Sequence, residues 1–238
     1  MNDDHQASAR LSGGGQLSAG GSVGSAADLC GGGKVVAHPG GITITTHLWL
    51  TWMEIAIEQA RLARRARAEM KRLYDDGDSG AALHLLSQEF RASIVAVAAS
   101  AHAMDALYGS LVIPQTAHKL AQNRRGNIRE ALKRVFDTGK VNTPWVAGFE
   151  WLFQMRDAAA HAQEEALPPE PHPVVGRTGQ AHAQYTVEAA ERAVDFALAV
   201  LRWCVDHPRS KPPATVKWTT DMAPMVTRLE DQRSAQDT

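Results

Sequence analysis

The stretch ASIVAVAASAHAMDALYG, residues 92–109, decides the fold class of this sequence. Its larger apolar side chains alternate with alanines at spacings of three and four residues, which is the period of a helix with one wide apolar face. We therefore predict a helix over residues 81–108, and its apolar stripe comprises Ile94, Val95, Ala98, Ala101, Met104 and Leu107. Only 6% of the residues are aromatic and alanine is abundant, which favours closely packed helices over a β-sandwich.

The segments on either side of this stretch follow the same period. We expect further helices over residues 47–73, 127–136, 144–162 and 186–205, with Asn127 and Thr186 as N-caps. The predicted fold is all-α, an antiparallel bundle of about five helices. Residues 166–184 are too rich in proline and glycine for a helix, and they leave room for a short β-hairpin around 174–175 and 181–183.

Composition divides the chain into three parts. Residues 1–41 are rich in Gly and Ser and are expected to be a disordered tail, residues 42–207 to form the helical domain, and residues 208–238 to be a polar C-terminal tail. A translation start at Met53 is an alternative reading. The run GGGK at 31–34 lacks the first glycine and the hydroxyl residue of a phosphate-binding loop.

Bulk properties narrow the setting. The net charge is −1, so charge alone predicts no affinity for nucleic acid. Two distant cysteines provide neither a disulfide framework nor a cysteine zinc site, and Cys204 is expected to be a buried apolar residue. No apolar run is long enough to span a membrane, and the start has no signal-peptide core. We expect a soluble, cytoplasmic protein.

An arginine interrupts the apolar pattern of the helix predicted over 144–162. Arg156 continues the line of Trp145, Phe149 and Leu152, where the pattern predicts leucine. Asp157 and His161 are four residues apart and share another face of the helix. The structural interpretation is an ion pair and an ordinary helix end. The functional interpretation is a site containing Arg156, Asp157 and His161.

These three side chains permit a limited chemistry. A guanidinium clamps a phosphate with two hydrogen bonds, an imidazole moves protons near neutral pH, and the carboxylate can orient either group. This set suits RNA cleavage by the RNA's own 2′-hydroxyl better than acyl transfer, and we expect no cofactor. A metal site built from His161, His172 and His182 is a weaker alternative, because their spacing matches no zinc pattern.

The stretch RDAAAH, residues 156–161, resembles the Rx4–6H motif of HEPN domains, and the apolar helix at 92–109 resembles their second core helix. The resemblance covers residues 85–206. It implies an all-α, HEPN-like fold and a metal-independent endoribonuclease whose motifs face each other across a homodimer cleft. It also implies that Arg156 binds the scissile phosphate, that His161 transfers protons, and that Asp157 is the polar residue after the arginine.

Two basic clusters offer a path for RNA, although solvated basic helix faces are also common. The residues expected to bind RNA are Arg61, Arg64, Arg65, Arg124, Arg125 and Arg129. His102 and Asp105 lie three residues apart on the apolar helix. They are expected to form a pair in the core, and lining the same cleft as Arg156 is the alternative.

Three hypotheses follow. The first is a HEPN-like ribonuclease that acts as a homodimer on RNA, as a toxin or defence component with an antitoxin protein as a partner. The second is a catalytically inactive helical module that binds a nucleotide or a protein. The third is a helical scaffold in which Arg156 only forms an ion pair.

Overall fold

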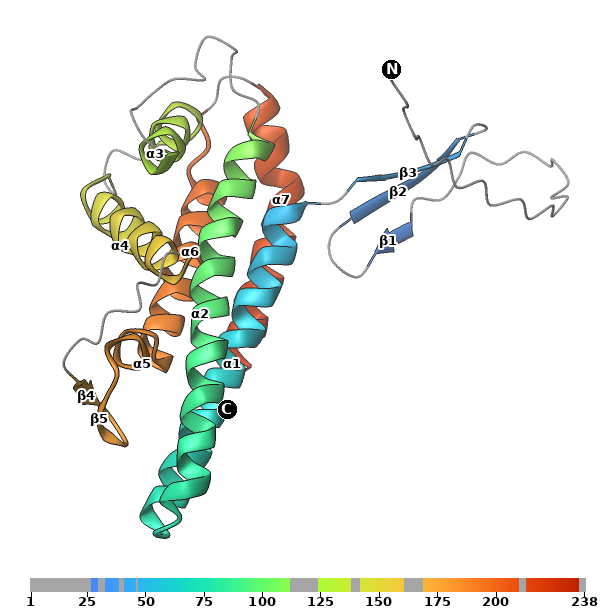
Figure 1. The fold of residues 1–238 in the computed structure, drawn as a ribbon. Coiled ribbons are helices and arrows are strands. Elements are labelled where there is room, and N and C mark those ends of the chain that lie inside the picture. Colours follow the sequence, from blue (N-terminus) through green and yellow to red (C-terminus); the bar gives the residue numbers. More distant parts are fainter. Residues whose placement is uncertain are drawn as a thin grey trace, which may run out of the picture.

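The computed structural model describes residues 27–29, 33–38, 41–45, 47–111, 124–137, 142–160, 169–209 and 213–235. Within these ranges the chain forms seven helices and two small antiparallel sheets (Figure 1). The predicted all-α fold is confirmed. None of the described helices is both long enough and apolar enough to cross a membrane.

The longest elements are α1 (Leu48–Asp75) and α2 (Ser79–Ser110), which form an antiparallel helical hairpin along the length of the molecule (Figure 1). The turn between them contains Gly77 with a φ of +85°, a conformation that glycine adopts without a steric penalty. Asp78 caps α2, because its carboxylate accepts a hydrogen bond from the Ala81 amide at 3.1 Å. Buried alanines on both helices let their backbones approach closely, and these include Ala56, Ala60, Ala96 and Ala103.

Three further helices join this pair, namely α3 (Arg124–Val135), α4 (Asn142–Ala160) and α6 (Val187–Asp206). Helices α4 and α6 both pack on α2, and their buried side chains join one main core. Thr186 is at the N-cap position of α6, as predicted. Asn127 is not the N-cap of α3, since that helix begins at Arg124. The burial of Gly126 and Ile128 shows that packing outweighs the weak helix propensity of this stretch.

A β-hairpin precedes α6, as predicted, but its strands are formed by other residues than expected. Strands β4 (Glu170–His172) and β5 (Gly176–Thr178) pair antiparallel, and residues 173–175 form the turn between them. Val174 and Val175 pack from this turn against a small cluster beneath it. The second expected strand is instead the short helix α5 (Gln180–Gln184).

The C-terminal segment is part of the main core, and the expectation of a polar tail over 208–238 is wrong for residues 213–234. Helix α7 (Pro213–Ser234) packs against α6 and α1. Met222, Val226 and Leu229 are buried in the main core. Trp218 and Met225 also pack against this core, but polar residues are interspersed among the apolar ones, so the composition of the segment concealed the stripe.

Part of the segment expected to be disordered forms a sheet. Strands β1 (Ala27–Leu29), β2 (Gly33–His38) and β3 (Gly41–Thr45) pair antiparallel in that order. The register places Val35 opposite Ile44, and β-branched residues such as these favour strands. The remainder of the expected tail, residues 1–26, 30–32 and 39–40, lies outside the described residues.

Candidate functional site

Arg156 lies near the C-terminal end of α4, where the apolar row of that helix leaves the core. Trp145, Phe149 and Leu152 are buried, whereas the Arg156 side chain is 24% exposed. Its guanidinium lies over the Phe153 ring, 4.5 Å from the ring centroid. The arginine therefore follows the row to its edge, where its stem can cover apolar surface while its charge stays near water.

Two carboxylates hold this guanidinium. Arg156 donates to Asp105 Oδ2 at 3.1 Å from Nη1, and to Asp157 Oδ1 at 2.7 Å from Nη2 and 3.0 Å from Nε. Asp157 therefore contacts Arg156, as its expected role of orienting the guanidinium requires. Asp105 comes from α2, so the ion pair also ties α4 to the central helix.

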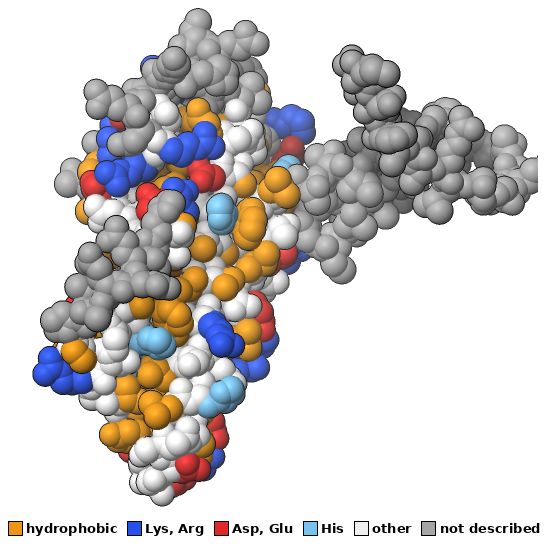
Figure 2. All heavy atoms as spheres, in the orientation of Figure 1, with side chains coloured by type: hydrophobic (Ala, Val, Ile, Leu, Met, Phe, Trp, Pro, Cys, Tyr) orange, Lys and Arg blue, Asp and Glu red, His pale blue; other side chains and the backbone are white. Residues whose placement is uncertain are grey.

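A second arginine binds the same aspartate. Arg124 Nε of α3 donates to Asp105 Oδ1 at 2.7 Å, and its guanidinium lies 4.5 Å from the centroid of the Tyr108 ring. We call Asp105, Arg124, Arg156 and Asp157 the two-arginine cluster. Figure 2 shows basic and acidic side chains gathered over the part of the molecule where α2, α3 and α4 meet. One carboxylate thus holds two guanidinium groups from different helices close together.

His161, the third expected catalytic residue, lies outside the described residues. A different histidine is described near the cluster. His102 is three residues before Asp105 on α2, its side chain is exposed, and its ring lies against Trp52 in a tilted arrangement, with centroids 4.9 Å apart and an interplanar angle of 31°. His102 and Asp105 are therefore not a pair satisfied in the core. Asp105 contacts Arg156, which agrees with one part of the alternative interpretation, whereas the described contact of His102 is with Trp52.

Of the six residues expected to bind RNA, Arg124 is the one that belongs to the two-arginine cluster. On the same helix, Arg125 pairs with Glu150 at 2.8 Å and Arg129 lies 3.9 Å from Glu130. These neighbours belong to separate ion pairs on the surface, which typically contribute little to stability.

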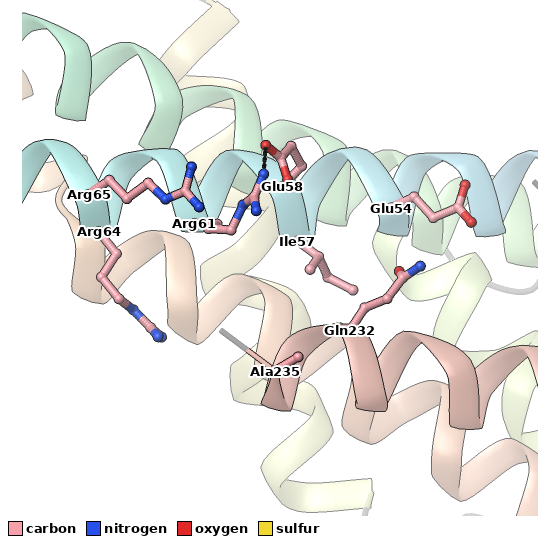
Figure 3. A pocket seen from close by; sticks show the side chains of 8 residues that line it. All are labelled: Glu54, Ile57, Glu58, Arg61, Arg64, Arg65, Gln232 and Ala235. Carbon is pink, nitrogen blue, oxygen red and sulfur yellow. Dashed lines mark hydrogen bonds and ion pairs between the residues drawn. The ribbon is translucent and has the colours of Figure 1, made fainter. Parts of the chain in front are cut away.

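The basic cluster of α1 lines a different hollow, of about 600 Å³, between α1 and the end of α7 (Figure 3). Figure 3 shows Arg61 turned toward Glu58, to which it bonds at 2.5 Å, and Arg64 pointing away from it. Arg64 pairs with Glu191 of α6 at 2.5 Å, and Arg65 is exposed. Carboxylates thus balance much of this positive charge. The structure does not bring Arg61, Arg64 or Arg65 to the two-arginine cluster.

Sequence reasoning missed a buried polar network below the β4–β5 hairpin. Glu89 of α2 is 1% exposed and accepts hydrogen bonds from Arg67 Nε at 2.9 Å, Arg67 Nη2 at 2.5 Å and the Val187 amide at 3.1 Å. Arg67 also pairs with Glu188 at 3.0 Å. A lone glutamate between apolar residues of a predicted core helix was the available signal. Its partners, however, come from distant parts of the chain.

His172 of β4 completes this network. Its Nδ1 accepts from the amides of Val174 and Val175 at 3.3 and 3.4 Å, which leaves the proton on Nε2, 3.7 Å from Glu89 Oε2. Burial lowers the pKa of His172, because desolvation disfavours the imidazolium more than the charge of Glu89 favours it. The neutral imidazole and the paired glutamate thus lie side by side below the hairpin, without a direct hydrogen bond between them.

The alternative of a histidine metal site has no support among the described residues. His182 stacks on Phe90 with ring centroids 4.3 Å apart, and burial lowers its pKa. No group of three or more His, Cys, Asp or Glu side chains is placed to hold a metal ion in the described part of the chain. Cys204 is buried, as predicted, and burial raises the pKa of its thiol.

Comparisons of the chain with models of protein families, with curated proteins and with solved structures give no match. The resemblance to HEPN domains therefore stays a hypothesis that depends on the motif and on the all-α fold.

Proposed function

We propose that this chain is a metal-independent endoribonuclease of the HEPN type, acting as a toxin or defence component. One observation carries the proposal. Arg124 and Arg156, from two helices, bond the two oxygens of the Asp105 carboxylate at 2.7 and 3.1 Å. A phosphodiester carries the same single charge and also presents two oxygens, so it is suited to replace the carboxylate between the two guanidinium groups.

The exchange of Asp105 for a phosphate is energetically reasonable. The side chains of Arg156 and Asp105 are 24% and 22% exposed, so water reaches both partners of the ion pair. Ion pairs accessible to water typically contribute about 0–1 kcal/mol, and an incoming phosphate can offset that loss. Asp157 remains on the other side of Arg156 and can hold the guanidinium in position.

The chemistry follows from an activated 2′-hydroxyl. Its oxygen attacks the adjacent phosphorus, the new O2′–P bond forms, and the P–O5′ bond breaks. A base takes the 2′-hydroxyl proton, and an acid supplies a proton to the departing 5′-oxygen. Arg156 and Arg124 stabilise the negative charge that develops on the phosphate oxygens. The motif resemblance assigns proton transfer to His161.

The test is incubation of the purified chain with a mixed-sequence RNA in EDTA, followed by analysis of the product ends. We expect 2′,3′-cyclic phosphate ends, and a loss of about 10²–10³-fold in rate for Arg156→Ala, the magnitude found when one transition-state donor is removed. Arg124→Ala should give a smaller loss. Lys217→Ala is the control, since Lys217 is an exposed basic residue of α7 that pairs with Asp221 of its own helix and is not among the expected RNA-binding residues. Absence of cleavage by the native chain would contradict the proposal.

A second function is favoured by the same contacts. Asp105 and Asp157 already hold Arg156, which is what a catalytically inactive binding module would also show. Binding of a 2′-deoxy oligonucleotide, which cannot be cleaved by this route, separates the two functions. A pure binding module binds this probe, cleaves no RNA, and loses about 0.7 of its log–log salt slope for each phosphate contact removed by Arg156→Ala or Arg124→Ala.

A further inference from the structure

We propose that the groove between α1 and α2 binds an amphipathic helix of a partner protein, and that a carboxylate of that helix sits between Arg65 and Arg91. This inference is independent of the proposed ribonuclease function. The groove has a volume of about 510 Å³ and is lined from both long helices. None of the residues that line the groove belongs to the two-arginine cluster or to the Glu89 network.

The shape of the groove suits a helix. The lining residues of α1 and of α2 follow the same spacing, with positions 59, 62, 66 and 69 on one side and 85, 88, 92 and 95 on the other. Ten residues of helix span about 15 Å, so an occupant would contact the groove over almost three turns. This is the geometry by which an amphipathic helix is recognised in a groove between two others.

The floor and walls of the groove are apolar. Ala66 and Ala92 are buried and small, which leaves the floor low enough for side chains of a third helix. Leu62 and Val95 are 39% and 41% exposed, although both are large apolar residues on well-packed helices. Covering them would remove apolar surface from water, which is favourable at about 25 cal/mol per Å².

The charge of the groove selects the partner. Arg67 of α1 bonds Glu89 of α2 across the antiparallel pair, which places Arg65 and Arg91 at about the same level. Both arginines line the groove and are exposed. Neither has an ion pair or a hydrogen bond to a side chain in the described part of the chain. Two cations on opposite walls therefore favour an anionic group between them.

The acidic residue in the wall does not neutralise these arginines. Glu69 accepts bonds from Arg72 Nη2 at 2.6 Å and Arg72 Nε at 2.9 Å, on the same helix. A partner carboxylate would consequently find Arg65 and Arg91 available. The combination of apolar walls and two opposed arginines fits a helix with leucine-like residues at spacings of three and four and an acidic residue between them.

The test uses two designed helical peptides and the full chain. Both peptides are side-chain-bridged and carry leucines at helical spacing, and they differ only in having Glu or Lys at the positions that flank the leucine stripe. Fluorescence anisotropy at low and high salt measures their affinities. We expect the Glu peptide to bind at least about tenfold more tightly at low salt, since like charges oppose the Lys peptide.

The variants Arg65→Glu and Arg91→Glu should each remove this preference, while Lys217→Glu, an exposed site on α7, should leave it unchanged. Leu62→Ser with Val95→Ser should weaken both peptides. Circular dichroism checks that each variant is folded. Equal binding of the two peptides, or no binding of either, would overturn the proposal. It would also be overturned by a dimer of the chain that Leu62→Asp and Val95→Asp dissociate, because the groove would then be an interface between copies.

Discussion

Glu89 shows how one side chain can join three distant segments of the chain. Its carboxylate accepts hydrogen bonds from Arg67 of α1 and from the first amide of α6. It also lies 3.7 Å from the His172 ring of the hairpin. A buried carboxylate is tolerated only when its charge is compensated, and here Arg67 and backbone hydrogen bonding provide the compensation. The charged groups around His172 are Glu89, Arg67 and Glu188, and His182 is a further titratable neighbour.

This environment predicts a loss of stability in mild acid. The pKa of His172 is lowered in the folded state, so below the ordinary value of about 6.5 the unfolded chain binds more protons than the folded chain. The contribution of neutral His172 to the free energy of unfolding is complete above about pH 6.5. It declines as the pH falls from there through the pKa of His172 in the folded chain. His182, whose pKa is also lowered, acts in the same direction.

Urea unfolding at several pH values between 7.5 and 5 measures this effect. His172→Asn keeps an acceptor for the Val174 and Val175 amides but does not titrate, so its free energy of unfolding should fall less steeply with acid than that of the native chain. His84→Asn is the matched control, since His84 is exposed and bonds only Gln88 among the described residues. The same slope in His172→Asn and the native chain would show that His172 is not responsible.

At the scale of elements, the contact between α4 and α6 depends on a glycine. A Cβ atom added to Gly148 would overlap the ring of Phe196, which itself packs edge-on against Phe149 with ring centroids 5.2 Å apart. Helix propensity alone favours alanine over glycine by about 1 kcal/mol. The steric overlap acts in the opposite direction, so the two effects can be separated by experiment.

We predict that Gly148→Ala lowers the free energy of unfolding by about 1–3 kcal/mol, the usual cost of overpacking a core. Gly109→Ala on α2 serves as the control, because no atom lies within 4 Å of its added Cβ. That control should be neutral or slightly stabilising. Equal stability of the two variants in urea unfolding would mean that α4 shifts freely on α6.

Helix α7 provides a second test at this scale. Val226 is fully buried in the main core, whereas Val216 of the same helix is 42% exposed. Val226→Ala should destabilise the chain by about 2 kcal/mol through lost burial and the cavity that remains. Val216→Ala should change stability by less than about 0.5 kcal/mol, as surface substitutions usually do. Thermal and urea unfolding measure both, and similar effects would contradict the docking of α7.

At the scale of the whole molecule, the proposed ribonuclease is a homodimer with the two motifs facing each other. If both protomers contribute to one site, the rate per chain should fall when the protein is diluted below its dimer dissociation constant. Light scattering at the same concentrations should show the mass falling from two chains to one. A rate per chain that stays constant across this transition would contradict a shared site.

Mixing two inactive variants sharpens this prediction. Arg156→Ala and His161→Ala chains, each inactive alone, form mixed dimers when combined. If one site uses groups from both protomers, the mixture should recover part of the activity, and Lys217→Ala chains mixed with either variant act as the reference. Recovery would not be expected from a site contained within a single chain.

Much of the fold could be predicted from local patterns. The apolar period of α1, α2, α4 and α6 located these helices, and the Pro- and Gly-rich stretch before α6 located the hairpin. The apolar stripe of α7 was missed, because a few apolar residues among many polar ones give a weak periodic signal. The strands β1–β3 were missed because glycine-rich composition outweighed a few β-branched residues.

The sequence by itself determined the all-α class and the unusual place of Arg156 on an apolar row, because both depend on spacing along one helix. Only the tertiary structure decided which charges meet. Asp105 receives Arg124 and Arg156, Glu89 receives Arg67, and the remaining arginines of α1 lie elsewhere. The physical reason is that helical periodicity is local, whereas each ion pair depends on how helices far apart in the sequence pack against one another.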